Sequence, residues 1–272
     1  MTKGKIGIFD SGVGGLTVAR EVIKLLPLES IVYLGDTARV PYGTKSSLTV
    51  TKFSAQALNF LQTRGVKLIV IACNTVSALS LSSLKKNFSL PIVGVLKPGA
   101  EKAVNTTRRG VIGVIGTEAT IRSRAYPKII KSINPKIKVR ERSCPLLVPL
   151  VEEGWLKEKV TYSVVSFYLR PLLKKRIDTL ILGCTHYPLL KSVIQEIVGE
   201  KIVLIDSARE VAKQVRKILK EENMLRDFKD WSGKNVSQHQ FFVTDRPEKF
   251  SSLTKVFLGK NINGNVQKIS LE

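Results

Sequence analysis

The chain has 272 residues, of which 43% are hydrophobic, so it can bury one large core or two ordinary ones. Its 44 lysine and arginine residues outnumber 22 acidic ones, which gives a formal net charge of +22. Such a surface attracts polyanions, but the basic residues are scattered without interleaved aromatics or a nucleic-acid-binding motif, which favours a lysine-rich solvated surface. No apolar run has membrane-spanning length and no signal-peptide core precedes the first predicted strand, so we expect a cytoplasmic protein.

Short β-branched runs alternate with amphipathic stretches along the chain, a pattern typical of repeated βα units and a mostly parallel sheet. The strands are predicted at residues 5–9, 31–34, 67–72, 91–95, 111–115, 137–140, 179–182, 202–205 and 240–243. Apolar residues at helical spacing lie between them, for example within residues 16–26. Ser207 followed by Glu210 predicts a capping box at the start of a later helix.

An internal repeat organises the chain into two halves. The segment KLIVIACNT at residues 67–75 reappears as TLILGCTH at 179–186, and IGIFDS at 6–11 is echoed by IGVIGT at 112–117. We therefore expect two pseudo-symmetric α/β domains with a crevice between them. Because Lys97-Pro98-Gly99 interrupts the pattern, the first domain is predicted at residues 1–97 with 207–272 and the second at 98–206. The tail after residue 206 is predicted to hold helix and one strand, and to pack back onto one half.

Two of the three cysteines occupy matching positions in this repeat. Cys73 and Cys184 each follow an apolar strand and precede a predicted helix, at the strand ends where open parallel sheets bind ligands. The amides of a helix N-terminus favour negative charge, so we expect both thiols to ionise more readily than an ordinary cysteine. An odd cysteine count argues against a disulfide framework. Cys144, which precedes a proline and an apolar run, is assigned to packing.

Two thiols facing each other across a crevice suit the chemistry of a racemase. Such an enzyme removes a proton from one face of a tetrahedral carbon and returns one to the other, which requires a base and an acid on opposite sides. The hydroxyls of Ser11, Thr75 and Thr185, with nearby amides, could hold a substrate carboxylate. The alternative is that each cysteine is a small buried hydrophobe. Their matched placement favours the catalytic interpretation.

Asp10 and His186 are the ionisable residues nearest the two thiols. Asp10 either caps the glycine-rich loop at residues 12–15, binds a substrate ammonium or supports Cys73, and His186 either orients Cys184 or is structural. The loop lacks a Walker lysine and the full dinucleotide spacing, so no nucleotide site is predicted. A zinc site from Cys73, Cys184 and His186 is conceivable, but no local pair has structural-zinc spacing; we expect no metal and no cofactor.

Specific motifs run through nearly the whole chain. They are FDSGVGGLT at residues 9–17, LGDTAR at 34–39, PYG at 41–43, ACNT at 72–75, GTEAT at 116–120, the segment 144–155 that begins CP and ends EEGW, and GCTHYP at 183–188. Together they resemble the motifs of the glutamate racemases, within the aspartate/glutamate racemase superfamily. The resemblance implies that Cys73 and Cys184 are the catalytic acid/bases, assisted by Asp10 and His186.

The resemblance also implies a set of substrate contacts: Asp10, Ser11, Tyr42, Gly43, Asn74, Thr75, Thr185 and His186. Thr117 and Glu152 fall in matching motifs near the site. One departure is Lys97, which stands at the domain junction where the family pattern leads us to expect an acidic residue.

The activity implied is a cofactor-independent isomerisation of L- and D-glutamate by two-base proton transfer. A bacterial, cytoplasmic homodimer would thereby supply D-glutamate for peptidoglycan, and so for cell-wall biogenesis and cell shape, without membrane association. The nearest alternative is a racemase for aspartate or another acidic amino acid. A more distant alternative is a nucleic-acid-binding protein, which only the net charge favours.

Overall fold

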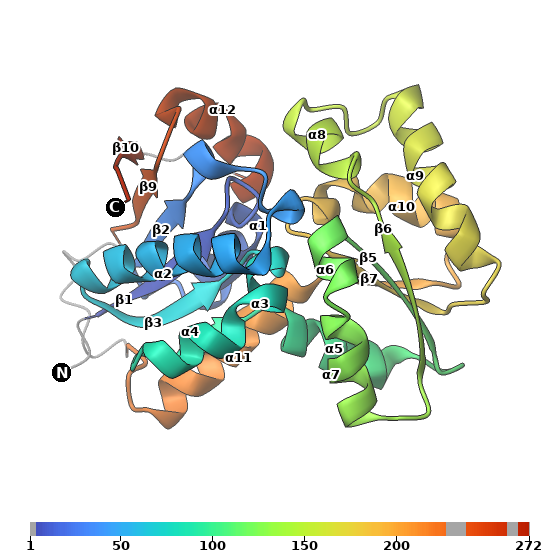
Figure 1. Cartoon of the computed structure of the whole chain (residues 1–272), viewed down its shortest axis with the longest axis horizontal. Helices are drawn as coiled ribbons and strands as arrows, with labels where there is room; N and C mark the ends of the chain where they lie inside the picture. Colours follow the sequence, from blue (N-terminus) through green and yellow to red (C-terminus); the bar gives the residue numbers. More distant parts are fainter. Residues whose placement is uncertain (1–3, 227–237, 260–265, 272) are drawn as a thin grey trace.

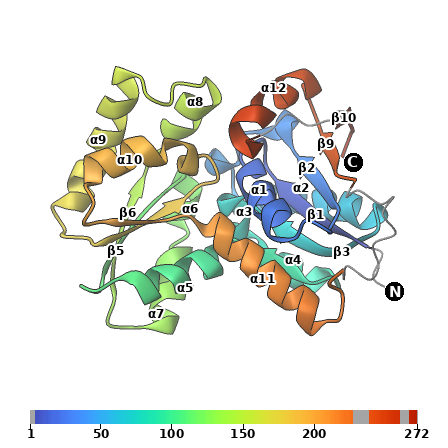
Figure 2. The ribbon, with the colours of Figure 1, turned by 180° about the vertical axis from the view of Figure 1, so that it is seen from behind.

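The computed structural model describes residues 4–226, 238–259 and 266–271; the first three residues of the basic N-terminal stretch lie outside these ranges. The described residues form two parallel β-sheets that lie side by side, each flanked by helices (Figures 1 and 2). The predicted α/β architecture with two mostly parallel sheets is therefore confirmed. None of the described helices combines the length and the apolar character that a membrane span requires.

The first sheet has the strand order β10-β9-β2-β1-β3-β4, and every neighbouring pair is parallel. Its strands are β1 (Lys5–Asp10), β2 (Ile31–Gly35), β3 (Val66–Ile71), β4 (Ile92–Gly94), β9 (Gln240–Val243) and β10 (Val266–Lys268). The helices around it are α1 (Leu16–Leu25), α2 (Ser47–Thr63), α3 (Asn74–Leu79), α4 (Leu81–Asn87), α11 (Ser207–Glu221) and α12 (Pro247–Leu258). The central strands β2 and β3 are buried along their whole length, as expected where helices cover both faces.

The second sheet has the order β6-β5-β7-β8, again with parallel pairs only. It contains β5 (Val111–Gly116), β6 (Lys138–Ser143), β7 (Thr179–Gly183) and β8 (Val203–Ile205). Its helices are α5 (Leu96–Thr106), α6 (Glu118–Arg122), α7 (Ala125–Ile133), α8 (Leu147–Glu152), α9 (Lys159–Leu173) and α10 (Lys191–Val198). The order matches β2-β1-β3-β4 of the first sheet strand for strand. The sequence repeat thus corresponds to equivalent strands, β1 with β5 and β3 with β7.

The chain crosses between the sheets twice, through α5 and through the connection from β8 to α11 (Figure 2). The predicted break at Lys97-Pro98-Gly99 is wrong, because these residues lie in the first turn of α5, where a proline costs no hydrogen bond. A Cβ on Gly99 would lie 3.0 Å from the Cβ of Ser207, so glycine lets the two crossings touch. Lys97 points outward and lies 3.8 Å from Glu101.

The domain boundaries at residues 1–97 with 207–272, and at 98–206, remain a proposal. Their support is that β9 and β10 of the tail join the first sheet beside β2. The halves are packed together, since one apolar cluster extends from α1 through α11 and α5 into the second sheet. We refer to the two sheets with their surrounding helices as the first and second half.

The tail differs from the sequence-based prediction in two details. The N-cap of α11 is Asp206 and not Ser207: its carboxylate accepts a hydrogen bond of 2.9 Å from the amide of Ala208. The tail also contains a second strand, β10, which was not predicted. Its three residues are too few for an alternating pattern to distinguish a strand from a loop.

Candidate active site

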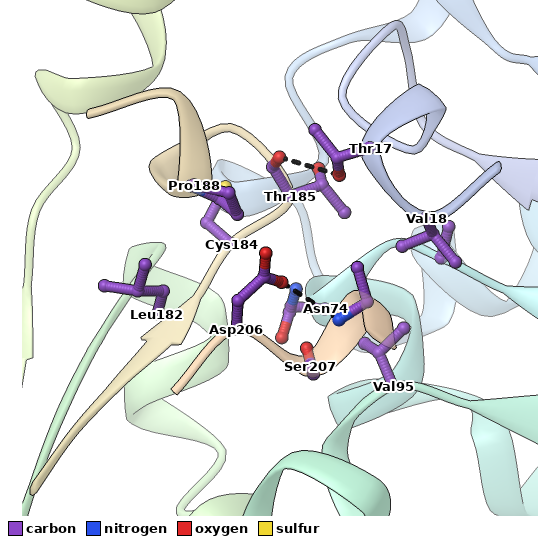
Figure 3. A pocket seen from close by; sticks show the side chains of 12 residues that line it. Thr17, Val18, Asn74, Val95, Leu182, Cys184, Thr185, Pro188, Asp206 and Ser207 are labelled. Carbon is purple, nitrogen blue, oxygen red and sulfur yellow. Dashed lines mark hydrogen bonds between the residues drawn. The ribbon is translucent and has the colours of Figure 1, made fainter. Parts of the chain in front are cut away.

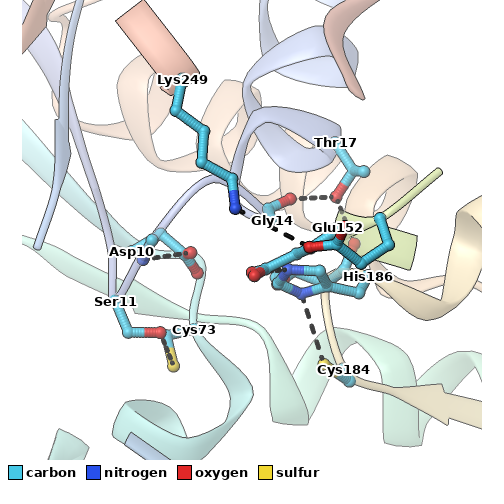
Figure 4. A network of polar contacts seen from close by, with 12 residues as sticks. Asp10, Ser11, Gly14, Thr17, Cys73, Glu152, Cys184, His186 and Lys249 are labelled. Atoms are coloured by element: carbon cyan, nitrogen blue, oxygen red, sulfur yellow. Dashed lines mark hydrogen bonds and ion pairs between the residues drawn. The ribbon is translucent and has the colours of Figure 1, made fainter. Parts of the chain in front are cut away.

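Both repeated cysteines lie at the carboxyl ends of equivalent strands, Cys73 after β3 and Cys184 after β7. They face one cavity of about 330 Å³ between the two halves. The first half lines it with Ser11, Gly12, Val40, Pro41, Tyr42, Gly43, Thr44, Cys73, Asn74 and Thr75, and the second with Thr117, Glu118, Pro145, Val148, Pro149, Glu152, Cys184, Thr185 and His186. Figure 4 shows the two sulfur atoms on either side of the same space. The structure therefore brings together the two thiols that the repeat matched.

Of the site residues expected from the sequence, only Asp10 is absent from the cavity lining. It lies beneath the glycine-rich loop, where its Oδ2 accepts a hydrogen bond of 2.9 Å from the amide of Gly12. Burial raises the pKa of Asp10, and the charge of His186 acts in the opposite direction. Of the roles considered for Asp10, capping the loop is the one that has a hydrogen bond.

Cys73 lies in an environment that keeps its thiol protonated. Its sulfur is 3.4 Å from the hydroxyl oxygen of Ser11, and it forms the N-cap of α3, a helix of only six residues. Burial raises the pKa of Cys73 to about 12, despite the hydrogen bonds from Ser11 and from the amide of Val76. The expectation that this thiol ionises more readily than usual is therefore wrong, because desolvation outweighs the helix terminus.

Cys184 has a different partner, the buried imidazole of His186. The Nδ1 atom of His186 lies 3.8 Å from the Cys184 sulfur, and its Nε2 atom lies 3.0 Å from Oε1 of Glu152 (Figure 4). Burial alone would lower the pKa of His186, but the hydrogen bonds with Cys184 and Glu152 raise it to about 10. The imidazolium places a positive charge beside the Cys184 sulfur. The two thiols thus have unlike surroundings.

Hydroxyl and amide groups from both halves meet on the cavity wall. The hydroxyl of Thr75 lies 2.9 Å from that of Thr117, and the amide oxygen of Asn74 accepts a hydrogen bond of 2.9 Å from the hydroxyl of Tyr126. A Cβ on Gly43 would lie 2.9 Å from the Cβ of Thr117, so this close approach requires glycine. Thr117, expected only near the site, is part of its wall.

The His, Cys, Asp and Glu side chains of the described residues form no cluster of three or more that could hold a metal ion. The zinc arrangement considered for Cys73, Cys184 and His186 is thus not formed.

The model of the Asp/Glu/Hydantoin racemase family matches residues 16–215. The chain belongs to this family. A glutamate racemase from Geobacter metallireducens is 52% identical over 267 residues, which cover 98% of this chain and 97% of that protein. The structure of a glutamate racemase isoform from Bacillus anthracis has a TM-score of 0.93 at 41% identity, covering 100% of this chain and 99% of that one. The structure of a glutamate racemase from Francisella tularensis in complex with D-glutamate has a TM-score of 0.91 at 38% identity. The match covers 100% of this chain and 99% of that one. This chain is accordingly an isomerase of the racemase class.

One residue that holds the cavity wall, Asp36, escaped the sequence analysis. It is fully buried at the end of β2, where Oδ2 accepts hydrogen bonds from the Tyr42 hydroxyl and from Nε of Arg39 at 2.7 Å. Its Oδ1 accepts a hydrogen bond of 2.9 Å from Thr244, next to β9. The available signal was an acidic residue at a strand end inside the LGDTAR motif, equivalent in place to Asp10.

Proposed function

We propose that this racemase interconverts L- and D-glutamate by moving protons between the substrate α-carbon and the thiols of Cys73 and Cys184. The observation that carries the proposal is the placement of both thiols at equivalent strand ends, facing one cavity between the halves. Its relatives of high identity support the choice of substrate, since they are glutamate racemases and one structure holds D-glutamate.

The unlike surroundings of the thiols suggest how the reaction begins. In one direction a Cys184 thiolate, paired with the His186 imidazolium, takes the α-proton, and the neutral Cys73 thiol gives its proton to the opposite face of the carbon. Afterwards Cys184 is a thiol and Cys73 a thiolate, so the opposite direction starts from reversed protonation states. Glu152 holds His186 through the hydrogen bond at Nε2.

The cavity wall supplies the groups that would bind the amino acid. Backbone amides and hydroxyls at Ser11, Asn74, Thr75 and Thr185 are suited to carboxylates and to the negative charge that develops after deprotonation. Tyr42, Gly43 and His186 complete the proposed contacts. Asp10 would act from beneath the loop and not by direct contact. The mechanism proposed needs neither a cofactor nor a metal ion.

We further propose that the enzyme is a cytoplasmic homodimer that supplies D-glutamate for peptidoglycan. These three points rest on family membership. Two of them are tested separately from the chemistry: the homodimer by the sedimentation of the purified protein, and the supply of D-glutamate by the D-glutamate requirement of cells that lack the enzyme.

The decisive experiment is chiral analysis of the product in deuterium oxide. The purified enzyme, with no added cofactor, should convert L-glutamate into D-glutamate and place deuterium at the α-carbon of the product. Racemisation of L-aspartate without any turnover of glutamate would refute the proposed substrate and favour the alternative acidic amino acid.

A further inference from the structure

A buried threonine of α1 joins the two halves beneath the cavity. Thr17 is only 1% exposed, and its hydroxyl oxygen lies 2.9 Å from the carbonyl oxygen of Gly14 and 3.2 Å from that of Thr185. Figure 3 shows the contact of Thr17 with Thr185, and Figure 4 shows its contact with Gly14. Thr17 belongs to the first half, whereas Thr185 stands between Cys184 and His186 in the second. The hydroxyl therefore reaches the turn that carries the second thiol and its imidazole.

The carbonyl of Thr185 lacks a donor from within its own turn. Such a carbonyl usually accepts from the amide three or four residues later. Here the third residue is Pro188, which has no N–H, and the fourth, Leu189, donates to His186 at 3.1 Å. Among the described residues, the Thr17 hydroxyl is the donor recorded for this carbonyl. The single hydroxyl proton of Thr17 is shared between this carbonyl and that of Gly14, so a threonine of one half gives a bifurcated hydrogen bond to a backbone group that a proline leaves open in the other.

The glycine loop of the first half packs directly against the same turn. A Cβ on Gly14 would lie 2.2 Å from the Thr185 hydroxyl oxygen and 2.6 Å from Nδ1 of His186, so only glycine permits this approach. The space left between the halves at this point is about 10 Å³, lined by Thr17, Cys184 and Asp206 among others (Figure 3). The turn therefore has little room to shift relative to the first half.

We propose that Thr17 is a positioning residue of this racemase: its hydroxyl holds the turn of Cys184, Thr185 and His186 against the first half and so sets the separation of the two sulfur atoms. The inference rests on the proposed two-thiol reaction, in which both sulfurs must reach one carbon. Misplacement of a reacting group by about 1 Å costs about a hundredfold in rate. The turn also carries Thr185 and His186, two of the proposed substrate contacts, whereas Ser11 and Thr75 lie in the first half, so loss of the anchor weakens binding only in part and lowers turnover more.

The test compares two substitutions at the same position. Thr17→Val keeps the shape but removes the hydroxyl, and should lower kcat by about tenfold to a hundredfold with KM within about threefold of the wild type. Thr17→Ser keeps the hydroxyl and should restore kcat to within about threefold. If Thr17→Val does not fold, Thr17→Ala gives the same comparison without the extra methyl group. The inference is overturned if Thr17→Val keeps full turnover, or if kcat falls as far in Thr17→Ser as in Thr17→Val.

Thr179→Val is the matched control. Thr179 is fully buried and its hydroxyl lies 3.2 Å from Oδ1 of Asp178, but it stands at the opposite end of β7 from Cys184. This variant should keep kcat within about twofold, because positional effects on chemistry require contact with the reacting groups or their supports. An equal loss of turnover in Thr179→Val and Thr17→Val would overturn the inference in favour of a general loss of stability.

A measurement without substrate separates this inference from the proposed function. Amide hydrogen exchange in peptides covering residues 184–190 should be faster in Thr17→Val than in the wild type, and unchanged in Thr179→Val. A wild-type protein that does not racemise glutamate refutes the proposed function, while the exchange data still decide whether Thr17 anchors the turn. Unchanged exchange in Thr17→Val overturns the inference even if the wild type is fully active.

Discussion

The Nε2 atom of the His186 imidazole donates a hydrogen bond of 3.0 Å to Oε1 of Glu152, while its Nδ1 atom faces the sulfur of Cys184. The two contacts together hold the pKa of His186 at about 10, against the effect of its burial. In the same contact the pKa of Glu152 is lowered, so the pair is most stable as a carboxylate with an imidazolium. The imidazolium of this pair lies next to the thiol of the second half, with the carboxylate on its far side.

Removal of the Glu152 charge should therefore move the alkaline limit of activity. In Glu152→Gln the imidazolium loses its anionic partner, so the pKa of His186 falls and the imidazole beside Cys184 loses its proton at lower pH. We expect the alkaline limb of the kcat/KM profile to move down by about 1 unit or more, measured between pH 6 and 11.

The neighbouring residue provides the control for that variant. Glu153 is 68% exposed and its Oε1 lies 4.0 Å from Nζ of Lys249, whereas the carboxylate that contacts His186 is that of Glu152. Glu153→Gln should leave the limb in place. An unmoved limb in Glu152→Gln would mean that the imidazolium does not take part in the reaction.

Loss of either thiol should abolish two-way racemisation. Cys73→Ser and Cys184→Ser each remove one of the two proton carriers, and we expect kcat to fall by about 10³-fold or more. Each variant should still exchange the α-proton of the one enantiomer whose hydrogen faces the remaining thiol. The measurement is product chirality together with deuterium content at the α-carbon.

Cys144→Ala tests whether the loss of activity in the two thiol variants comes from the chemistry or from impaired folding. Cys144 is fully buried, and its sulfur lies 3.6 Å from the carbonyl oxygen of Arg142, outside the cavity lining. The variant should keep kcat within about twofold, since its contacts do not reach the site. Equal losses in all three cysteine variants would contradict a special role for the pair.

The location of the thiols could be predicted from the sequence because strand ends and repeats are local signals. An apolar run that ends in Cys73 or Cys184 places each thiol at the carboxyl edge of a sheet, and the repeat places the two edges in equivalent positions. The anchors at Asp36 and Thr17 escaped notice because their partners, Thr244 and Thr185, are more than 160 residues away in the chain.

The errors in the sequence-based prediction have a common physical cause. Pro98 and Gly99 usually interrupt a helix, but the first turn of α5 tolerates the proline, and the close contact with Ser207 favours the glycine. Likewise the predicted ionisation of Cys73 took account of the helix terminus and not of burial, which only the folded chain reveals. Both outcomes depend on tertiary packing and not on local propensity.

The two thiols should differ in reactivity although they are equally accessible. Cys73 is 6% exposed and Cys184 is 7% exposed, so access does not decide which one an alkylating reagent attacks. The reactive species is the thiolate. Because the pKa of Cys73 is raised to about 12, iodoacetamide at pH 7.5 should label Cys184 at least about tenfold faster than Cys73.

The labelling rates are measured by mass spectrometry of the two cysteine peptides. The rate for Cys73 should still be rising with pH at pH 10, since its thiol remains largely protonated there. Equal rates for both peptides at pH 7.5 would contradict the asymmetry on which the proposed direction of the first proton transfer depends.

The ion pair between Lys67 and Glu29 should govern stability without governing catalysis. The Lys67 Nζ atom lies 2.8 Å from Oε2 of Glu29, and the side chains are only 7% and 2% exposed. Lys67 stands near the start of β3, at the end opposite Cys73. Glu29→Gln leaves the buried ammonium without its partner charge and should lower the free energy of unfolding by about 3–5 kcal/mol, measured by urea denaturation.

An exposed ion pair is the control for this loss of stability. Lys217 and Glu221 lie 3.8 Å apart on α11 with exposures of 66% and 58%, so Glu221→Gln should change the free energy of unfolding by at most about 0.5 kcal/mol. Because Glu29 lies away from the cavity, the fraction of Glu29→Gln that remains folded should racemise glutamate at the wild-type rate. A stability loss as small as that of Glu221→Gln would show that water or rearrangement compensates the buried charge. A loss of turnover in the folded fraction would mean that a change at this end of β3 alters the position of Cys73.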